Sequence, residues 1–229
     1  MKKILFVLAL VAFSMTLFSC QTKQKKAEKF VKQDLSQVLY DFDSYQPIST
    51  IVTEAKDIPI NNEKCVDKAL DAIANYSLAC DYLGESRSAM DLARIWGAPT
   101  YYSSSYSDSK YYSNISDAID NGDKANFHIK KRNEAINELK TLMHQTNSSK
   151  TIGYCIDHKF RCRTKGGDWT IGHYRYVVDK KMKQKIFYLD EEDSVTSFIQ
   201  SVENNTYEKC DDTLDLSGLK KILQHKYKR

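Results

Sequence analysis

The histidines and cysteines have the widest chemical range of the side chains in this sequence. The five histidines form no HExxH motif and no other close pair of metal ligands; they are His128, His144, His158, His173 and His225. His158, His173 and Cys162 could share one face of a sheet and bind a metal ion there. We interpret the two histidines instead as hydrogen-bonded sheet residues, and we expect no metal ion and no cofactor.

Nucleophilic catalysis finds little support in the sequence. There is no G-x-S-x-G elbow and no P-loop, and no cysteine lies in a local signature of a cysteine hydrolase. The acidic run 190–193 lacks the ligand spacing of a calcium loop and is typical of a solvated turn before a helix. We therefore expect no catalytic residue and a non-enzymatic binding or scaffold protein. The alternative is a hydrolase with an unrecognised cysteine and histidine site.

A segment rich in tyrosine and serine is the best candidate for a partner contact. Residues 100–113 show neither helical nor strand periodicity and contain five of the 15 tyrosines, Tyr101, Tyr102, Tyr106, Tyr111 and Tyr112. Tyrosine provides a large contact surface at low entropy cost, and serine adds adaptable hydrogen bonds. We predict that the segment contacts a protein or a glycan. The alternatives are a mobile polar loop and tyrosines that fold back onto the neighbouring helices.

Two long helices are predicted to carry this segment between them. Apolar residues at three- and four-residue spacing predict one helix over about 61–95, which the Gly-Ala-Pro sequence at 97–99 ends. A second helix is predicted over about 115–146, with a break around 121–123 at Asn-Gly-Asp. Two long helices joined by one connection indicate an antiparallel helical hairpin.

Alternating apolar and polar residues predict a sheet on either side of the hairpin. The predicted strands are 48–53, 151–164, 169–179 and 182–189. Gly166 and Gly167 predict a two-residue turn between the second and third strands. That turn places Phe160 opposite His173. It also pairs Cys162 with Ile171, and the buried face is then predicted to contain Ile156, Phe160 and Ile171.

The order of these elements predicts an α+β fold with an antiparallel sheet. An amphipathic helix over 27–40 precedes the first strand and is expected to pack on the sheet; its apolar stripe is Ala27, Val31, Leu35, Val38 and Leu39. A turn-rich stretch at 41–45 follows this helix. Short helices are predicted near 193–202 and 217–227. We expect a single domain over 27–229, with the helical hairpin inserted at about 60–149.

The first residues have the pattern of a secretory signal peptide. Lys2 and Lys3 are followed by the unbroken apolar run 4–13. A membrane-spanning helix needs about 20 apolar residues, and this run is shorter. We therefore predict a signal peptide over 1–19. The alternative is a single anchor helix.

The sequence Leu-Phe-Ser-Cys at 17–20 resembles the lipobox of bacterial lipoproteins, with Phe18 in the place of a smaller residue. The resemblance implies cleavage before Cys20, acylation of Cys20 and attachment to the lipid bilayer through that residue. Gln21 stands where aspartate often signals retention at the inner membrane, which implies the outer membrane and a periplasmic orientation. Residues 20–26 would form a lipidated tether that spans about 20 Å when extended.

Charge and cysteine content agree with export to the bacterial envelope. The sequence contains 34 basic and 30 acidic residues, and removal of Lys2 and Lys3 leaves 32 against 30. A balance of +2 is not that of a nucleic-acid-binding protein, so we expect no nucleic-acid partner. Exported proteins can keep disulfides. A bridge between Cys65 and Cys80 is excluded because both are predicted in one helix, and a bridge between Cys155 and Cys162 is excluded because both are predicted in one strand. Five cysteines remain besides Cys20: Cys65, Cys80, Cys155, Cys162 and Cys210. Either they form bridges between different elements, with one cysteine left over, or all five stay reduced.

A second resemblance covers about half of the mature chain. The sequence DFDSYQPI at 41–48 is similar to a D-P-x-S-Y-x-P-I stretch in many small lipoproteins of unknown function, with Phe42 in the place of the proline. The Arg-Thr-Lys-Gly-Gly hairpin at 163–167 also resembles that group. The resemblance implies a compact helix-on-sheet fold, somewhat cystatin-like, and no particular activity.

Overall fold

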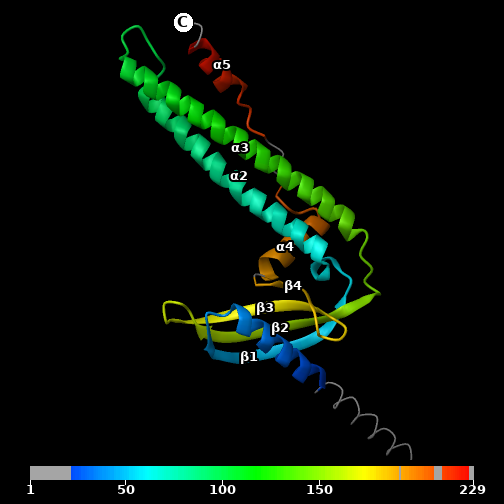
Figure 1. Cartoon of the computed structure of the whole chain (residues 1–229). Helices are drawn as coiled ribbons and strands as arrows, with labels where there is room; N and C mark the ends of the chain where they lie inside the picture. The colour runs from blue at the N-terminus through cyan, green and yellow to red at the C-terminus, as the bar shows by residue number, and fades with distance from the viewer. Residues whose placement is uncertain (1–21, 191, 209–212, 227–229) are drawn as a thin grey trace, which may run out of the picture. The chain divides into compact units, whose positions relative to one another are not determined.

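The computed structural model describes residues 22–190, 192–208 and 213–226, and the chain divides into two compact units (Figure 1). Unit 1 comprises Met1–Val66 and Gln145–Ser197, and unit 2 comprises Asp67–His144 and Phe198–Arg229. The predicted α+β class, the antiparallel sheet and the long helical hairpin are all confirmed.

Unit 1 is a helix packed on a four-stranded sheet. All neighbouring strands are antiparallel, and their order in the sheet is the order of the chain. The N-terminal helix is described over 22–38. The strands of the sheet are β1 (Asp41–Lys56), β2 (Thr151–Arg163), β3 (Trp169–Asp179) and β4 (Lys185–Leu189). A short 3₁₀ turn, η1 (Pro59–Asn61), follows β1.

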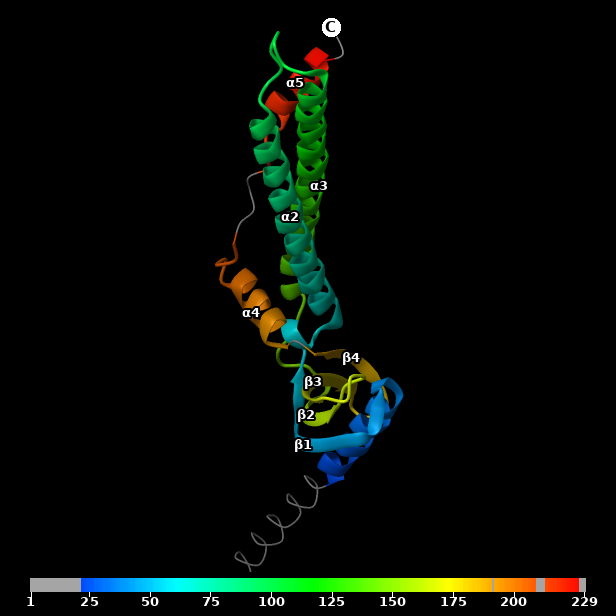
Figure 2. The ribbon, with the colours of Figure 1, turned by 90° about the vertical axis from the view of Figure 1, so that its left-hand side faces the viewer.

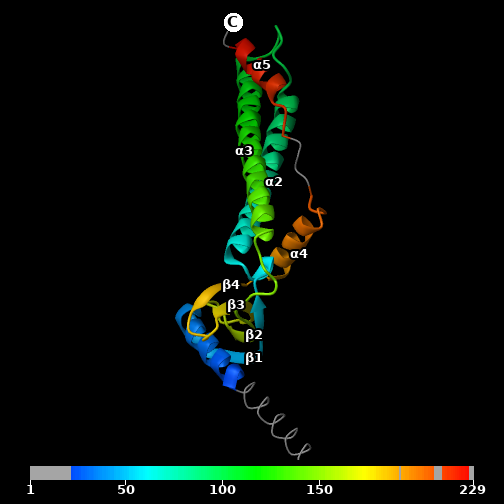
Figure 3. The same ribbon diagram turned by 90° about the vertical axis from the view of Figure 1, so that its right-hand side faces the viewer.

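The N-terminal helix covers one face of the sheet (Figure 3) and forms the main core of unit 1. As predicted from their four-residue spacing, Ala27, Val31 and Leu35 are fully buried. They contact the inward-facing side chains of the sheet, which include Ile156, Phe160, Cys162, Tyr176 and Val178. Val38 was predicted in the same stripe but is 60% exposed, because the helix ends there.

The start of the helix corrects the expected tether. Residues 22–26 are helical instead of extended, so they rise only about 1.5 Å each. Gln24 fixes this end of the helix to the sheet, because its Nε2 donates a hydrogen bond of 2.8 Å to the carbonyl oxygen of Thr50. Five of the seven residues of the expected tether, 22–26, therefore belong to the N-terminal helix.

The turn between β2 and β3 differs from the prediction by one residue. The N–H of Gly167 donates to the carbonyl oxygen of Thr164, and the N–H of Thr164 donates to the carbonyl oxygen of Asp168. Gly167 has a φ of +90°. These features define a three-residue hairpin loop with glycine at its last position, not a two-residue turn at both glycines.

This extra loop residue moves every pair of β2 and β3. Phe160 pairs with Gly172 instead of His173, and Cys162 pairs with Thr170 instead of Ile171. Because side chains alternate between the two faces of a strand, a shift of one residue reverses the face. Ile171 is consequently 63% exposed, although it was predicted in the core with Ile156 and Phe160, which are buried as expected.

Gly172 makes room for the aromatic core of the sheet. A Cβ atom at this position would lie 2.7 Å from Cε1 of Phe160, well inside van der Waals contact. The ring of Phe160 also contacts Tyr45 and Tyr174, at centroid distances of 5.6 and 5.5 Å. A side chain at Gly172 would therefore displace a ring that has neighbours on several sides.

The turn-rich stretch at 41–45 lies inside β1, which is longer than the predicted strand 48–53. Asp41 pairs with Arg163, and the next pair is Gln46 with Arg161, so β1 advances five residues while β2 advances two. Ser44 closes this bulge, because its N–H and Oγ donate to Oδ1 and the carbonyl oxygen of Asp41 at 3.2 and 2.8 Å. The expected turn chemistry thus bends the strand without ending it.

Unit 2 is built on the helical hairpin, whose two arms run side by side (Figure 2). Its helices are α2 (Glu63–Trp96), α3 (Ser105–Met143), α4 (Glu192–Glu203) and α5 (Ser217–Lys226), and the boundaries of unit 2 fall inside α2 and α4. Asn62 caps the start of α2, because its Oδ1 accepts from the N–H of Cys65 at 3.4 Å. Helix α3 starts ten residues before the predicted 115, because Ser104 caps it and accepts from the N–H of Ser107.

The predicted break at 121–123 is absent, and α3 is continuous through it. Gly122 is buried there because Leu216 packs against it; a Cβ atom would lie 2.8 Å from the Leu216 methyl groups. Asn126, one turn further on, exchanges two hydrogen bonds with the backbone of Leu214, at 3.1 and 2.8 Å. Glycine and asparagine therefore fix the segment before α5 to α3 instead of interrupting the helix.

Arg132 is the largest fully buried side chain among the described residues. Its guanidinium lies over the rings of Tyr76 and Tyr207, at 4.9 and 5.9 Å from their centroids. It donates to the carbonyl oxygen of Glu208, whose carboxylate accepts from the hydroxyl of Tyr76. This arginine joins α2 and α3 to the segment that follows α4.

Replacement of Gly172 by alanine should destabilise the protein, because the new methyl group overlaps Phe160. We expect a cost of about 1–3 kcal/mol, measured as a lower urea midpoint of the sheet transition. Gly84→Ala is the matched control, since nothing lies within 4 Å of that position in α2 and alanine favours a helix. Equal midpoints for wild type and Gly172→Ala would show that Phe160 does not lie over Gly172.

Candidate functional site

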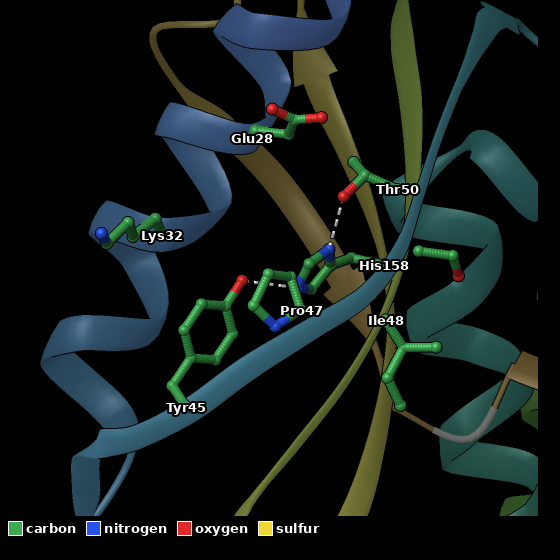
Figure 4. Close-up of a pocket in the computed structure, with 8 residues that line it drawn as sticks. Glu28, Lys32, Tyr45, Pro47, Ile48, Thr50 and His158 are labelled. Carbon is green, nitrogen blue, oxygen red and sulfur yellow. Dashed lines mark hydrogen bonds between the residues drawn. The ribbon is translucent and has the colours of Figure 1, made fainter.

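A pocket of about 490 Å³ lies between the N-terminal helix and the irregular part of β1 (Figure 4). Its walls come from three elements: the helix, β1 and β2. The lining residues are Glu28, Lys32, Tyr45, Pro47, Ile48, Ser49, Thr50 and His158. Five of the eight belong to one stretch of β1, so the shape of that strand determines the site.

Irregular pairing gives β1 this shape. The register shifts before Gln46 and again between Pro47 and Ser49. Pro47 has no N–H to donate and is tolerated because β1 is an edge strand. The two irregularities bend the strand away from regular pairing and direct Tyr45 toward the pocket, as Figure 4 shows.

His158 forms the floor of the pocket and is 1% exposed. Both of its ring nitrogens are hydrogen-bonded to side chains of β1 (Figure 4): Nε2 lies 2.9 Å from the hydroxyl of Tyr45, and Nδ1 lies 2.9 Å from Oγ1 of Thr50. The imidazole also stacks on Phe160, with 5.6 Å between centroids and 17° between planes. Its position is therefore fixed from three directions.

Burial keeps the imidazole of His158 uncharged at neutral pH. Desolvation lowers the pKa of His158 below its usual value, although the nearby charges of Asp157 and Glu28 act in the opposite sense. Burial, followed by the charge of Glu28, raises the pKa of Tyr45. A neutral imidazole has one donor and one acceptor nitrogen, so a protonated Tyr45 and the Thr50 hydroxyl satisfy both nitrogens in either tautomer.

The rim of the pocket carries one charge of each sign. Glu28 and Lys32 extend from successive turns of the N-terminal helix, and Pro47 and Ile48 provide apolar surface on the other side (Figure 4). This combination suits a small polar ligand that hydrogen-bonds to the rim and the hydroxyl groups. The two nitrogens of His158 already have partners, so the imidazole supports the walls of a binding pocket more directly than it serves a proton-transfer step.

His158, His173 and Cys162 do not come together on one face, and both histidines are hydrogen-bonded sheet residues, as we interpreted them. His173 lies on the opposite face of the sheet, where its Nε2 is 2.7 Å from Oδ1 of Asp157. Cys162 shares the inner face with His158 but is four residues further along β2, about 13 Å away, with Phe160 between them. Among the residues that the structure describes, no three His, Cys, Asp or Glu side chains gather as metal ligands.

The predicted separation of the cysteines holds for those that the structure describes. Cys65 lies in α2 with Cys80, and Cys155 faces away from Cys162 on β2. All four are free thiols, of which only Cys80 is exposed. Cys155 lies 3.3 Å from Oδ1 of Asn61. Burial and the charge of Asp57 raise the pKa of Cys65 to about 11, which makes it a poor nucleophile.

The tyrosines of the predicted contact segment divide into two groups. Tyr101 and Tyr102 lie in the connection between α2 and α3, at 95% and 93% exposure, and Tyr106 is 62% exposed in the first turn of α3. Tyr111 is half-buried against a core of Ala93, Ile115 and Ile119 and residues of α5. Tyr112 is also half-buried and contacts Tyr111 edge-on. Only the first three are placed for contact with a partner.

Several predicted features lie outside the described residues. They include the signal peptide, Cys20 and Cys210. The acidic run 190–193 is described only in part. No helix in the described ranges is long and apolar enough to cross a bilayer. Comparisons of the chain with protein-family models, with curated proteins and with solved structures found no match.

The buried imidazole predicts a loss of stability in acid. The unfolded chain protonates His158 near its ordinary pKa of about 6.5, whereas the folded protein resists that proton. The unfolded state therefore binds more protons as the pH falls below about 6.5, and the free energy of unfolding decreases. This stability is fully present above that pH.

Urea denaturation of wild type and His158→Gln at pH 7.5 and 5.5 measures this effect, because the two proteins differ only at this residue. We expect a larger loss in the wild type between the two pH values. Equal losses would show that His158 titrates as an exposed histidine does.

Proposed function

We propose that this protein is a lipid-anchored, non-enzymatic binding protein of the bacterial envelope, attached through Cys20 and facing the periplasm from the outer membrane. The resemblance of 17–20 to a lipobox supports the anchor. The helical start of the folded unit at residue 22 supports a position close to the lipid. The partner is an envelope protein or a glycan, and no cofactor or metal ion is needed.

The observation that carries the binding role is the exposure of aromatic side chains at the tip of the helical hairpin. We call residues 95–106 the hairpin tip. Ile95, Tyr101, Tyr102 and Tyr106 are 76%, 95%, 93% and 62% exposed, and Trp96 is 39% exposed and contacts Tyr106 edge-on at 5.7 Å. Clusters of exposed aromatic and apolar residues mark interaction sites on soluble domains.

The chemistry of the hairpin tip favours a neutral or weakly charged partner surface. From Ile95 to Ser107 the sequence contains no charged residue, so contact would depend on aromatic stacking, apolar burial and hydrogen bonds from serine hydroxyls. Tyrosine rings lose few rotamers when they are immobilised, which lowers the entropic cost of binding. The long arms α2 and α3 would hold this surface on a rigid support.

The hydrolase alternative depends on a cysteine activated by a histidine. His158 is hydrogen-bonded to two hydroxyl groups and His173 to a carboxylate. His128 is hydrogen-bonded to the side-chain amide of Asn75. These partners favour structural roles for the three histidines, so binding remains the better supported proposal.

Cys20→Ala tests the anchor. We expect the variant to lose acylation and to accumulate as uncleaved precursor, because the thiol is the site of lipid attachment. Mass spectrometry of the N-terminal peptide measures both. A wild-type chain whose mature N-terminus is another residue, without lipid, would contradict the proposed anchor.

The binding role of the hairpin tip is tested by photo-crosslinking in intact cells. A photoreactive phenylalanine analogue at Tyr101 should capture a discrete partner, and the same analogue at Tyr40, a tyrosine of unit 1 that is 73% exposed, should not. Tyr102→Ser combined with the label at Tyr101 should reduce the captured product several-fold without a change in melting temperature. Equal products at Tyr101 and Tyr40 would assign no binding role to the hairpin tip.

A further inference from the structure

The sheet of unit 1 has an outer face, opposite the N-terminal helix, that is basic and aromatic near the β2–β3 hairpin. Side chains at odd positions of β2 point to this face, and among them Lys159, Arg161 and Arg163 are exposed. We call these three residues the cation ladder. Their cross-strand partners on β3 are His173, Ile171 and Trp169. The cations of β2 therefore lie beside two exposed apolar side chains of β3, those of Ile171 and Trp169.

Trp169 contacts two guanidinium groups. The Cζ atoms of Arg161 and Arg163 lie 5.1 and 5.4 Å from its ring centroid, and the indole remains 49% exposed. Arg161 is further oriented by Gln46, whose Oε1 accepts from its Nε at 2.7 Å. These contacts fix the planes of the side chains and leave the Nη donors of Arg161 for other acceptors, which reduces the entropy lost on binding.

The cation ladder is not neutralised by the protein. Within the described residues, none of its three members forms an ion pair with a carboxylate. Asp157, the carboxylate nearest to it along the outer face of β2, is bonded to His173. Lys165 in the hairpin loop continues the row of positive charge. The carboxylates near this end of the row are Asp168 and Asp41, the β1 partner of Arg163, which accepts from the N–H of Ser44.

The spacing of the cation ladder fits a linear polyanion. Alternate residues on one face of a strand are separated by about 6.8 Å, so the backbone positions of the three cations repeat at regular intervals along β2. Guanidinium groups bind carboxylates through two parallel hydrogen bonds. The exposed part of the indole adds apolar surface beside them, against which a sugar ring can pack.

We propose that the outer face of the sheet is a docking surface for a linear acidic polysaccharide, bound by the cation ladder and packed against the exposed part of Trp169. The charge of the face is complementary to a polyuronate, and cations at alternate positions of a rigid strand match a polymer better than a mobile layer of lipid headgroups. The N-terminal helix, which leads back to the proposed anchor, occupies the other face of the same sheet. This site is separate from the hairpin tip and does not depend on lipid attachment.

Affinity electrophoresis of the unacylated mature chain, residues 20–229, through gels that contain alginate tests this proposal. We expect retardation by alginate, none by neutral dextran, and a retardation that weakens as salt is added. Arg161→Gln with Arg163→Gln should weaken binding at least about tenfold, because two charge-assisted contacts are lost. Trp169→Ala should weaken it too, whereas Trp169→Phe should retain most of the affinity.

Lys180→Gln with Lys183→Gln is the matched control, since it removes two exposed cations from the β3–β4 connection of the same unit. This control should bind alginate within about twofold of the wild type, and all variants should keep the wild-type melting temperature. Equal losses in the control and the arginine variant would overturn the proposal in favour of a general charge effect. Tighter binding to phosphatidylglycerol vesicles than to alginate would overturn it in favour of a membrane surface.

Discussion

The register of the β2–β3 hairpin is the constraint on which both candidate surfaces of unit 1 depend. The loop contains three residues because Gly167 adopts a positive φ and returns its N–H to Thr164. This length places Gly172 opposite Phe160. It therefore sends the even-numbered side chains of both strands toward the N-terminal helix and the odd-numbered ones away from it.

Two different environments follow from this single choice of register. On the inner face, His158 is buried with Phe160 and Tyr176 and reaches the hydroxyls of Tyr45 and Thr50. The outer face near the hairpin carries the cation ladder beside Trp169. A register shifted by one residue in β3 would exchange its faces: Trp169 would turn inward and Tyr176 would turn into solvent. The glycine at 172 reinforces the observed register because it leaves space for Phe160.

The sequence predicted the elements well, because their periodicities are long and regular. Helix α2 and strands β2 and β3 were placed within one or two residues. The errors arose where one residue type has two uses. Two adjacent glycines indicated a two-residue turn, but only Gly167 needs a positive φ. Gly122 indicated a break and instead admits Leu216. The serines and tyrosines after 104 indicated a loop, but Ser104 caps α3 and Tyr111 packs toward α5.

The candidate site was harder to predict than the fold. Cys20 and the exposed tyrosines have local signals, whereas the pocket combines a helix, a bulged strand and its neighbour. Its clearest local signals are the turn-forming residues and Pro47 in the middle of a strand, which mark an irregular edge. The pairing of His158 with Tyr45 and Thr50 requires both the β1 bulge and the β1–β2 register, and neither follows from alternation alone.

The most direct test of this account is the measurement of interstrand backbone contacts by NMR on the mature chain. The account predicts nuclear Overhauser effects that pair Phe160 with Gly172 and Cys162 with Thr170. It also predicts a solvent-accessible Trp169 indole. Contacts of Phe160 with His173, together with a protected indole, would contradict it, because they would put Trp169 on the inner face and dissolve the outer binding surface.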